Sequence, residues 1–117
     1  MLAPHDRESL LALLASYHAG EKPERERERA AVKAILAALS EVAPGRSVEL
    51  RIPPHAAIQV VAGHTHRRGT PSAVVETDSR TLVALALGEL TWAQAVAGGS
   101  LVASGERSDL SAYFPLA

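Results

Sequence analysis

The sequence predicts a small α+β domain, and three observations favour that class. Residues 6–18 and 23–42 each place apolar side chains at helical spacing. Residues 47–52 alternate between apolar and polar side chains, which is typical of a half-buried strand. Residues 78–105 read as helix, turn, helix, turn and strand, because caps and glycines separate short apolar runs. We expect one domain over residues 1–117, with a helical part over 1–43 and a sheet with core helices over 44–117.

Two helices are predicted in the N-terminal part. The first is expected from about Asp6, which can cap it, to His18, and its apolar face comprises Leu10, Leu11, Leu14 and Tyr17. The second is expected from Pro23, which suits a first helical turn, to Val42. Its apolar stripe comprises Val32, Ile35, Leu36, Leu39 and Val42.

The second helix opens with alternating charges over residues 24–29, ERERER. One interpretation is a polar arm that binds a partner. The simpler interpretation is a solvated helix end, in which Glu24 pairs with Arg27 and Glu26 with Arg29 one turn away. Because these charges alternate in sign, the segment produces no net electrostatic field, and this favours the interpretation as a solvated helix end.

Four short strands are predicted, and most of their pairings are expected to be antiparallel. They span residues 47–52, 57–62, 73–77 and 101–103, with a hairpin connection between the first two. The strand at 57–62 is the most uniformly apolar, so we expect it to be central in the sheet.

The stretch over residues 78–105 has the clearest local signals. Asp78 is placed to cap a helix, and Gly88 suits the left-handed residue that ends one. Thr91 and Gln94 have the spacing of a capping box, so a further helix should begin at Trp92. The single tryptophan, Trp92, fits two roles equally well, an aromatic anchor in the core or a residue at the mouth of an apolar pocket.

Composition excludes several functions. The formal net charge is −1 and aromatic residues are 3%, so neither a phosphate-attracting field nor base-stacking platforms are expected, and we predict no nucleic-acid partner. Cysteine is absent, which suits a reducing cytosol, and the N-terminus lacks a signal-peptide pattern. No apolar run approaches the length of about 18 residues that a membrane span needs, so we expect a cytoplasmic protein without integral membrane association.

The segment from residue 63 to residue 71 holds the densest group of reactive side chains, His64, His66, Arg67 and Arg68. Two histidines in an extended segment share a face, and His55 could be a third metal ligand only if the sheet brought it near. Because zinc sites normally use three or four protein ligands, we predict no metal site and no cofactor. The arginines could hold a carboxylate or phosphate, although a solvated loop is the favoured interpretation.

Two carboxylates near this segment suggest a catalytic interpretation. Glu76 and Asp78 could form an acid–base pair, but a surface Glu76 and a capping Asp78 explain the same residues more simply. No nucleophile–base pair is visible, so we predict no catalytic residue.

Residues 44–116 carry an ordered set of elements that resembles a known family. An acidic residue opens a helix at Asp78, and the chain continues with Leu87-Gly88-Glu89-Leu90, Gly99-Ser100-Leu101, Ser104-Gly105 and Leu110. In this order and spacing they resemble the C-terminal half of the sterol carrier protein type two family. The segments PGRSVELRIPP, RGTPSAVVETD, GELTWAQAVAGG and DLSAYFPL resemble a bacterial, actinobacterial sterol carrier-like branch. A more distant resemblance is to the C-terminal domain of mycothiol-dependent maleylpyruvate isomerase.

The resemblance implies a curved, mostly antiparallel sheet of four to five strands covered by helices on one side. It also implies a tunnel between sheet and helices that takes a lipid or other apolar small molecule, with residues 110–114 as a closing flap. The residues that it assigns to this tunnel are Leu82, Leu85, Ala86, Leu90, Trp92, Val96, Leu101 and Phe114.

Three functions follow as hypotheses. The first is non-catalytic binding or transfer of a lipid or sterol-like ligand in the tunnel. The second is an accessory or small enzyme domain similar to a thiol-dependent isomerase, with an acid–base or thiol-handling polar site at the loop over residues 64–78, formed by His64, His66, Arg67, Arg68 and Glu76. The third is a protein interaction module that uses the helix over residues 23–42.

Overall fold

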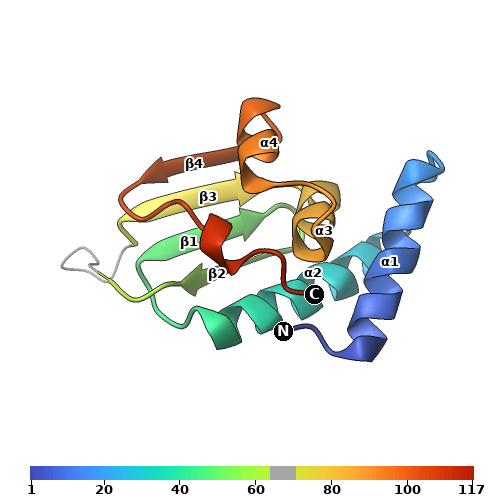
Figure 1. The fold of residues 1–117 in the computed structure, drawn as a ribbon, viewed down its shortest axis with the longest axis horizontal. Coiled ribbons are helices and arrows are strands. Elements are labelled where there is room, and N and C mark those ends of the chain that lie inside the picture. The colour runs from blue at the N-terminus through green and yellow to red at the C-terminus, as the bar shows by residue number, and fades with distance from the viewer. Residues whose placement is uncertain (64–70) are drawn as a thin grey trace.

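The computed structural model describes residues 1–63 and 71–117 and shows an α+β fold (Figure 1). The elements in chain order are α1 (Pro4–His18), α2 (Arg25–Val42), β1 (Val48–Ile52), β2 (Ala56–Val60), β3 (Ala73–Thr77), α3 (Ser79–Leu87), α4 (Trp92–Ala97), β4 (Leu101–Gly105) and a 3-10 turn (Ser111–Tyr113). The predicted fold class, with two N-terminal helices before the sheet, is confirmed.

The four described strands form one mixed sheet in the order β2-β1-β3-β4. The outer pairs, β1–β2 and β3–β4, are antiparallel, and the central pair, β1–β3, is parallel. Leu50 therefore faces Ile58 on one side and Val75 on the other. The expectation of mostly antiparallel pairing is confirmed, since two of the three pairings are antiparallel.

The predicted central place of the strand at 57–62 is wrong. That segment forms β2, which is an edge strand, while β1 and β3 are central. Two of its apolar residues are the small Ala57 and Ala62, and both are exposed. An apolar run built from alanine therefore does not require burial on both faces.

One face of the sheet packs on the core and the other is open. In β1, Val48, Leu50 and Ile52 are buried, whereas Glu49 and Arg51 pair with each other on the outer face. This is the predicted alternation, and it places the helices on one face. In Figure 1, α2 runs along the β2 side of the sheet and α4 lies beside β4.

The N-terminal helices differ from their predicted bounds and faces. α1 begins at Pro4, whose fixed φ suits the first helical turn, so Asp6 lies within that turn and is not the cap. Leu11 is 48% exposed, because the buried face of α1 runs through Leu10, Leu13 and Tyr17 at helical spacing. α2 begins at Arg25, after Pro23, and its last residue, Val42, is exposed at the end of the stripe.

Neither ion pair predicted for the alternating charges of residues 24–29 is present among the described residues. Arg27 instead donates to Ser16 Oγ at 3.1 Å, and Glu28 turns inward toward Tyr17. The run is therefore mostly exposed, as the simpler interpretation predicted, but its last carboxylate joins α2 to α1.

The predicted caps over residues 78–105 are confirmed. Asp78 Oδ1 accepts from the Thr81 N–H at 2.7 Å, and Gly88 ends α3 with a φ of 79°. Thr91 and Gln94 form the complete capping box before Trp92.

The C-terminal segment closes the core over α3. The Leu116 N–H donates to Ala86 O at 2.9 Å, which satisfies a carbonyl at the end of α3. The Leu2 N–H donates in turn to Leu116 O at 2.9 Å, so both termini lie side by side near α3 (Figure 1). Leu2, Leu110 and Leu116 are buried, which shows that this segment is part of the packed structure.

Candidate binding pocket

A partly enclosed pocket of about 360 Å³ lies where α3 ends, α4 begins and the C-terminal segment crosses them. Its lining residues are Leu85, Gly88, Leu90, Thr91, Trp92, Ala93, Ser111, Phe114 and Pro115. The volume and the apolar lining are within the range of small-molecule sites.

Local structure fixes the position of each wall. The left-handed Gly88 turns the chain out of α3, and the capping box at Thr91 restarts it as α4. Trp92 is therefore held at the first position of α4, facing the end of α3. The opposite wall comes from the segment after the 3-10 turn, whose path is fixed by the Leu116 to Ala86 hydrogen bond.

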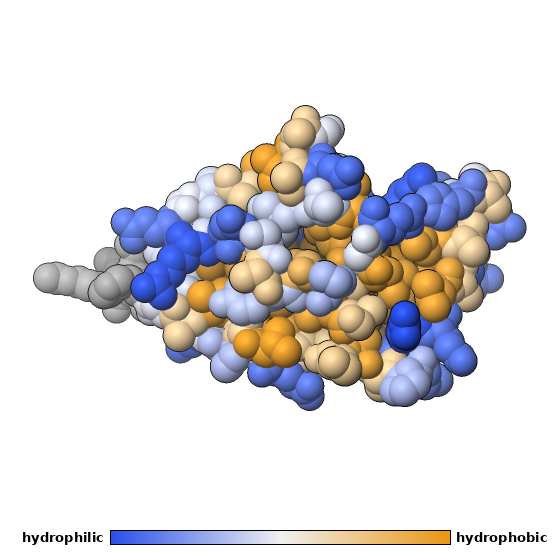
Figure 2. Space-filling model, viewed as in Figure 1, coloured by the Kyte–Doolittle hydropathy of each residue, from blue (hydrophilic) through white to orange (hydrophobic). Residues whose placement is uncertain are grey.

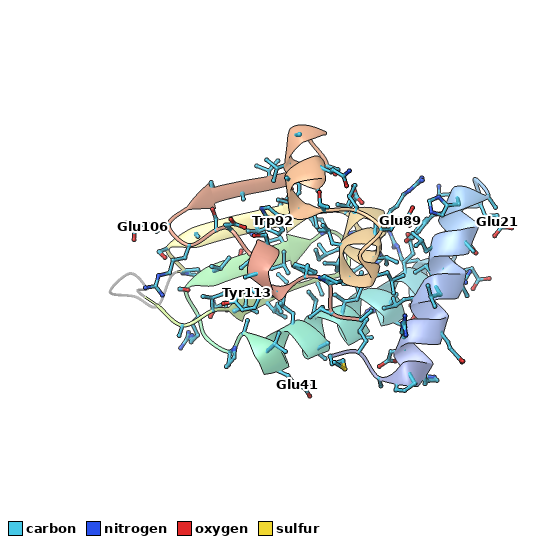
Figure 3. The ribbon with its side chains drawn as sticks, in the orientation of Figure 1. Glu21, Glu41, Glu89, Trp92, Glu106 and Tyr113 are labelled. Carbon is cyan, nitrogen blue, oxygen red and sulfur yellow. The ribbon has the colours of Figure 1, made fainter. Side chains whose placement is uncertain are left out.

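Trp92 and Phe114 join the two walls. Their rings stack with centroids 6.3 Å apart and planes 24° from parallel. Both rings are half-buried and pack against the core, and both line the pocket. Figure 3 shows Trp92 close to α4, with Tyr113 on the 3-10 turn below it. Trp92 thus combines the two roles considered from the sequence, core anchor and pocket wall.

The eight residues assigned to a tunnel by resemblance fall into three groups. Leu85, Leu90, Trp92 and Phe114 line the pocket. Leu82, Ala86 and Leu101 are buried in the packed core, and Val96 is 46% exposed on α4. The hollow space therefore lies at one end of α3 and does not extend along the whole helix. Contact of these residues with a ligand stays a prediction.

Sequence reasoning missed five lining residues, Gly88, Thr91, Ala93, Ser111 and Pro115. Gly88 and Thr91 were assigned only structural roles, as a helix end and a helix cap. The pocket nevertheless lies between the helix that Gly88 ends and the helix that Thr91 begins. Ala93 carried a usable signal, because it follows Trp92 on a helix whose start could be predicted. Ser111 falls in the 110–114 flap that the resemblance implies, although it was not named, and Pro115 carried no signal, since its position depends on where the C-terminal segment crosses α3.

The pocket carries no charge of its own. None of the lining residues, all within the described part of the chain, has an ionisable side chain. The N–H groups of Gly88, Leu90 and Thr91 already donate to Leu85 O, Ala84 O and Gln94 Oε1.

Two carboxylates belong to residues next to or hydrogen-bonded to lining residues, although neither lines the pocket itself. Glu89, between two lining residues, contacts His18 Nε2 at 2.6 Å and remains 41% exposed. Asp109 Oδ1 accepts from the N–H of the lining residue Ser111 at 2.9 Å. This backbone hydrogen bond, with a smaller contribution from the Ser111 hydroxyl, lowers the pKa of Asp109, so its carboxyl is ionised at neutral pH.

A polar cluster occupies the other end of α3. Glu28 Oε2 accepts from the Tyr17 hydroxyl at 2.5 Å and from Ser79 Oγ at 2.9 Å. His55, whose side chain is only 5% exposed, places Nε2 3.9 Å from Glu28 Oε1. Burial raises the pKa of Tyr17 to about 12, and the neighbouring Glu28 adds to the rise. We call these four residues, Tyr17, Glu28, His55 and Ser79, the polar junction.

The residues of the second and third functional hypotheses are placed as follows. His64, His66, Arg67 and Arg68 lie outside the described residues. Glu76 is exposed on the open face of the sheet, and Asp78 is the cap of α3. Within residues 1–63 and 71–117, no three histidine, aspartate or glutamate side chains gather as metal ligands would. Apart from the exposed Val42, the apolar stripe of α2 is buried inside the protein, so the surface of that helix is mainly charged residues and alanine.

Figure 2 shows hydrophobic residues gathered over the C-terminal segment and α3, two of the elements that supply the pocket walls. Hydrophilic side chains flank this area on the outer side of α1 and toward the far end of the sheet. None of the described helices combines the length and the apolar content that crossing a bilayer requires.

Comparison with known proteins identifies the family. No curated protein matches the sequence. The family described as "Bacterial SCP ortholog", where SCP denotes sterol carrier protein, has a model that matches residues 24–116. This match covers most of the chain and includes α2 as well as residues 44–116, which carry the elements of the resemblance. The chain therefore belongs to the bacterial sterol carrier protein ortholog family.

Proposed function

We propose that the protein binds an apolar small molecule, as a carrier without catalysis of its own, in the pocket between α3, α4 and residues 111–115. The observation that carries the proposal is a preformed space of about 360 Å³ between stacked aromatic rings and leucine side chains.

The physical chemistry of the walls supports this function. Moving hydrocarbon from water into such a space is favourable by about 0.8 kcal/mol per methylene. The walls belong to structured elements, so little ordering is needed when a ligand enters, and preorganisation of this kind improves affinity. Membership of the sterol carrier family supports the same class of ligand.

A matched pair of variants on α4 tests the pocket. Ala93 lines the pocket and is exposed, whereas Ala97 is exposed at the end of the same helix and does not line it. We expect the uncharged fluorescent probe N-phenyl-1-naphthylamine to bind the unaltered protein saturably. Ala93→Phe should reduce that binding at least tenfold by filling the space, and Ala97→Phe should leave it unchanged.

Circular dichroism and thermal unfolding of both variants check that each remains folded. Equal probe affinity in folded Ala93→Phe and Ala97→Phe proteins would contradict binding at this site. Native mass spectrometry of protein purified from its own host, followed by organic extraction, would then identify the ligand carried in the cell.

A further inference from the structure

The two edges of the sheet differ in how they are covered. The strand order β2-β1-β3-β4 leaves β2 and β4 at the edges. α2 packs beside β2, and Gln59 of that strand accepts from Arg46 Nε at 3.0 Å. Within the described part of the chain, no strand pairs with the outer edge of β4, and Figure 1 shows β4 as the outermost strand, with α4 extending past it.

The β4 edge lacks the features that normally prevent pairing with another chain. Proteins usually protect an exposed edge with a lysine, a proline or a bulge, because its backbone N–H and C=O groups are otherwise ready to pair. The segment over residues 90–105, which forms α4 and β4, contains no charged side chain and no proline. β4 pairs with β3 in a continuous register, so alternate residues turn their backbone groups away from β3. The edge can therefore accept a further strand.

Exposed valines lie along the same edge. Val102, at the middle of β4, is 65% exposed, and Val96 of α4 is 46% exposed. The turn between these two elements leaves space beside them, since no heavy atom lies within 4 Å of the position that a Gly99 side chain would take. Burial of both valines by a neighbouring chain would remove apolar surface from water, which is favourable.

β4 is complementary to a second copy of itself. Two copies related by a twofold axis pair in antiparallel fashion, and directly opposed residues face the same side of the joined sheet. An axis at Val102 sets this valine against its own copy on the open face, and sets Leu101 against Ala103 on the core face. Ser100 then lies opposite Ser104, so no like charges meet. Cross-strand pairs of β-branched side chains stabilise a sheet, so the central valine pair favours this register.

We propose that this edge is the interface of a homodimer, in which the β4 strands of two copies pair antiparallel about Val102 and join the two sheets into one. The occupant is a second copy of the chain, because the strand matches itself in charge and in the pattern of its two faces. α4 extends past β4, so in the dimer it lies over the strand of the second copy and removes Val96 from water. Two short strands and two short helices make a small interface, so the dimer is reversible, with a dissociation constant in the micromolar range.

A matched pair of lysine variants tests the interface. Sedimentation velocity from about 10 µM to about 1 mM should show the unaltered protein changing from monomer to dimer. Val102→Lys places a charge next to its own copy at the axis, so it should raise the dissociation constant at least tenfold. Val42→Lys makes the same change at the end of α2, where the valine is 46% exposed, and should leave the dissociation constant unchanged. Circular dichroism checks that both variants are folded.

Cysteine variants test the register, because the chain has no cysteine of its own. The Cβ atoms of directly opposed residues lie about 5 Å apart, so Val102→Cys should form a covalent dimer on mild oxidation. Ser104→Cys adds a thiol to the same face of β4, but the proposed axis separates its two copies by about 13 Å. It should therefore cross-link at least tenfold more slowly.

Each outcome decides one part of the proposal. A protein that remains a monomer at about 1 mM overturns the dimer. If folded Val102→Lys protein dimerises as tightly as Val42→Lys protein, the dimer uses another surface and the β4 interface is overturned. Equal rates of cross-linking in Val102→Cys and Ser104→Cys overturn the pairing about Val102. Loss of the dimer in Val102→Lys alone, with faster cross-linking of Val102→Cys, supports both the interface and its register.

Discussion

At its N-terminal end α3 meets α1 and α2 through hydrogen-bonded polar side chains, whereas at its C-terminal end it borders an incompletely filled apolar pocket. In the polar junction, Glu28 alone accepts two hydroxyl groups from two other helices. In the pocket, the stacked rings of Trp92 and Phe114 leave space between themselves and α3.

The difference indicates how one short helix can serve both stability and binding. Charge-assisted hydrogen bonds have strict geometry, so the polar junction fixes α3 against the rest of the protein. Apolar contacts are non-directional, so the opposite end can accept ligands of differing shape with little loss. We therefore expect variants of the polar junction to change stability, and variants of the pocket to change binding.

The largest effect is expected for Glu28→Ala. The change leaves the Ser79 hydroxyl without its acceptor and the Tyr17 hydroxyl with only its longer contact, 3.3 Å to Ser79 Oγ, which should lower the free energy of unfolding by about 2 kcal/mol. Urea unfolding measures this loss, while probe binding by the folded fraction should remain normal. Glu26→Ala, an exposed carboxylate in the same first turn, is the control and should change stability by about 0.5 kcal/mol. Similar losses in the two variants would remove the special role of Glu28.

Alkaline pH tests the same junction through Tyr17. The unfolded chain releases the phenolic proton near pH 10, while the folded protein holds it until about pH 12. Stability is therefore complete below pH 10 and falls as pH rises toward 12, by about 1–2 kcal/mol after allowance for solvent screening.

Urea unfolding at pH 9 and pH 11.5 measures this loss. Tyr17→Phe should show a smaller loss between these two values, because it cannot ionise, and Tyr113→Phe should behave as the unaltered protein. If all three proteins lost stability equally, the raised pKa of Tyr17 would not be linked to folding.

In the pocket, Phe114→Ala should affect binding more than folding. Removing one ring of the Trp92 stack opens the wall and should weaken binding of N-phenyl-1-naphthylamine about tenfold, which equals about 1.4 kcal/mol. Tyr113→Ala is the matched control, since Tyr113 is the neighbouring half-buried aromatic residue and does not line this pocket. Equal loss of binding in both variants would indicate a general effect of disturbing the C-terminal segment.

The features that were predictable from the sequence are those fixed by near neighbours. The Asp78 cap, the Gly88 helix end and the Thr91–Gln94 capping box each depend on residues within one helical turn, and each is confirmed. The alternation in β1 is equally local. The edge position of β2 was missed, because strand order depends on which distant segment pairs with β1.

Long-range contacts explain what was missed at both ends of α3. Three separate helices contribute Tyr17, Glu28 and Ser79, so no spacing rule in the sequence connects them. In the sequence, Glu28 is only one charge in a run that is predicted to be exposed. Four lining residues could be named because the family resemblance ordered the elements around them. The pocket stops before Leu82 and Ala86, which are buried in the packed core. Where it stops depends on side-chain packing, which a sequence pattern does not encode.

The smallest expected effect is that of a single methylene group in the ligand, and it tests how rigid the pocket at the C-terminal end of α3 is. In a series of straight-chain alcohols from six to fourteen carbons, each added methylene should tighten binding about fourfold while the chain still fits. Because the pocket holds about a dozen groups of methylene size, the gain should stop near ten carbons. Calorimetry on the unaltered protein and on Glu28→Ala should give the same limit, since the polar junction does not border the pocket. A gain that continued steadily to fourteen carbons would show that the C-terminal segment yields to longer chains, and that the pocket is less fixed than the packing of Leu110 and Leu116 indicates.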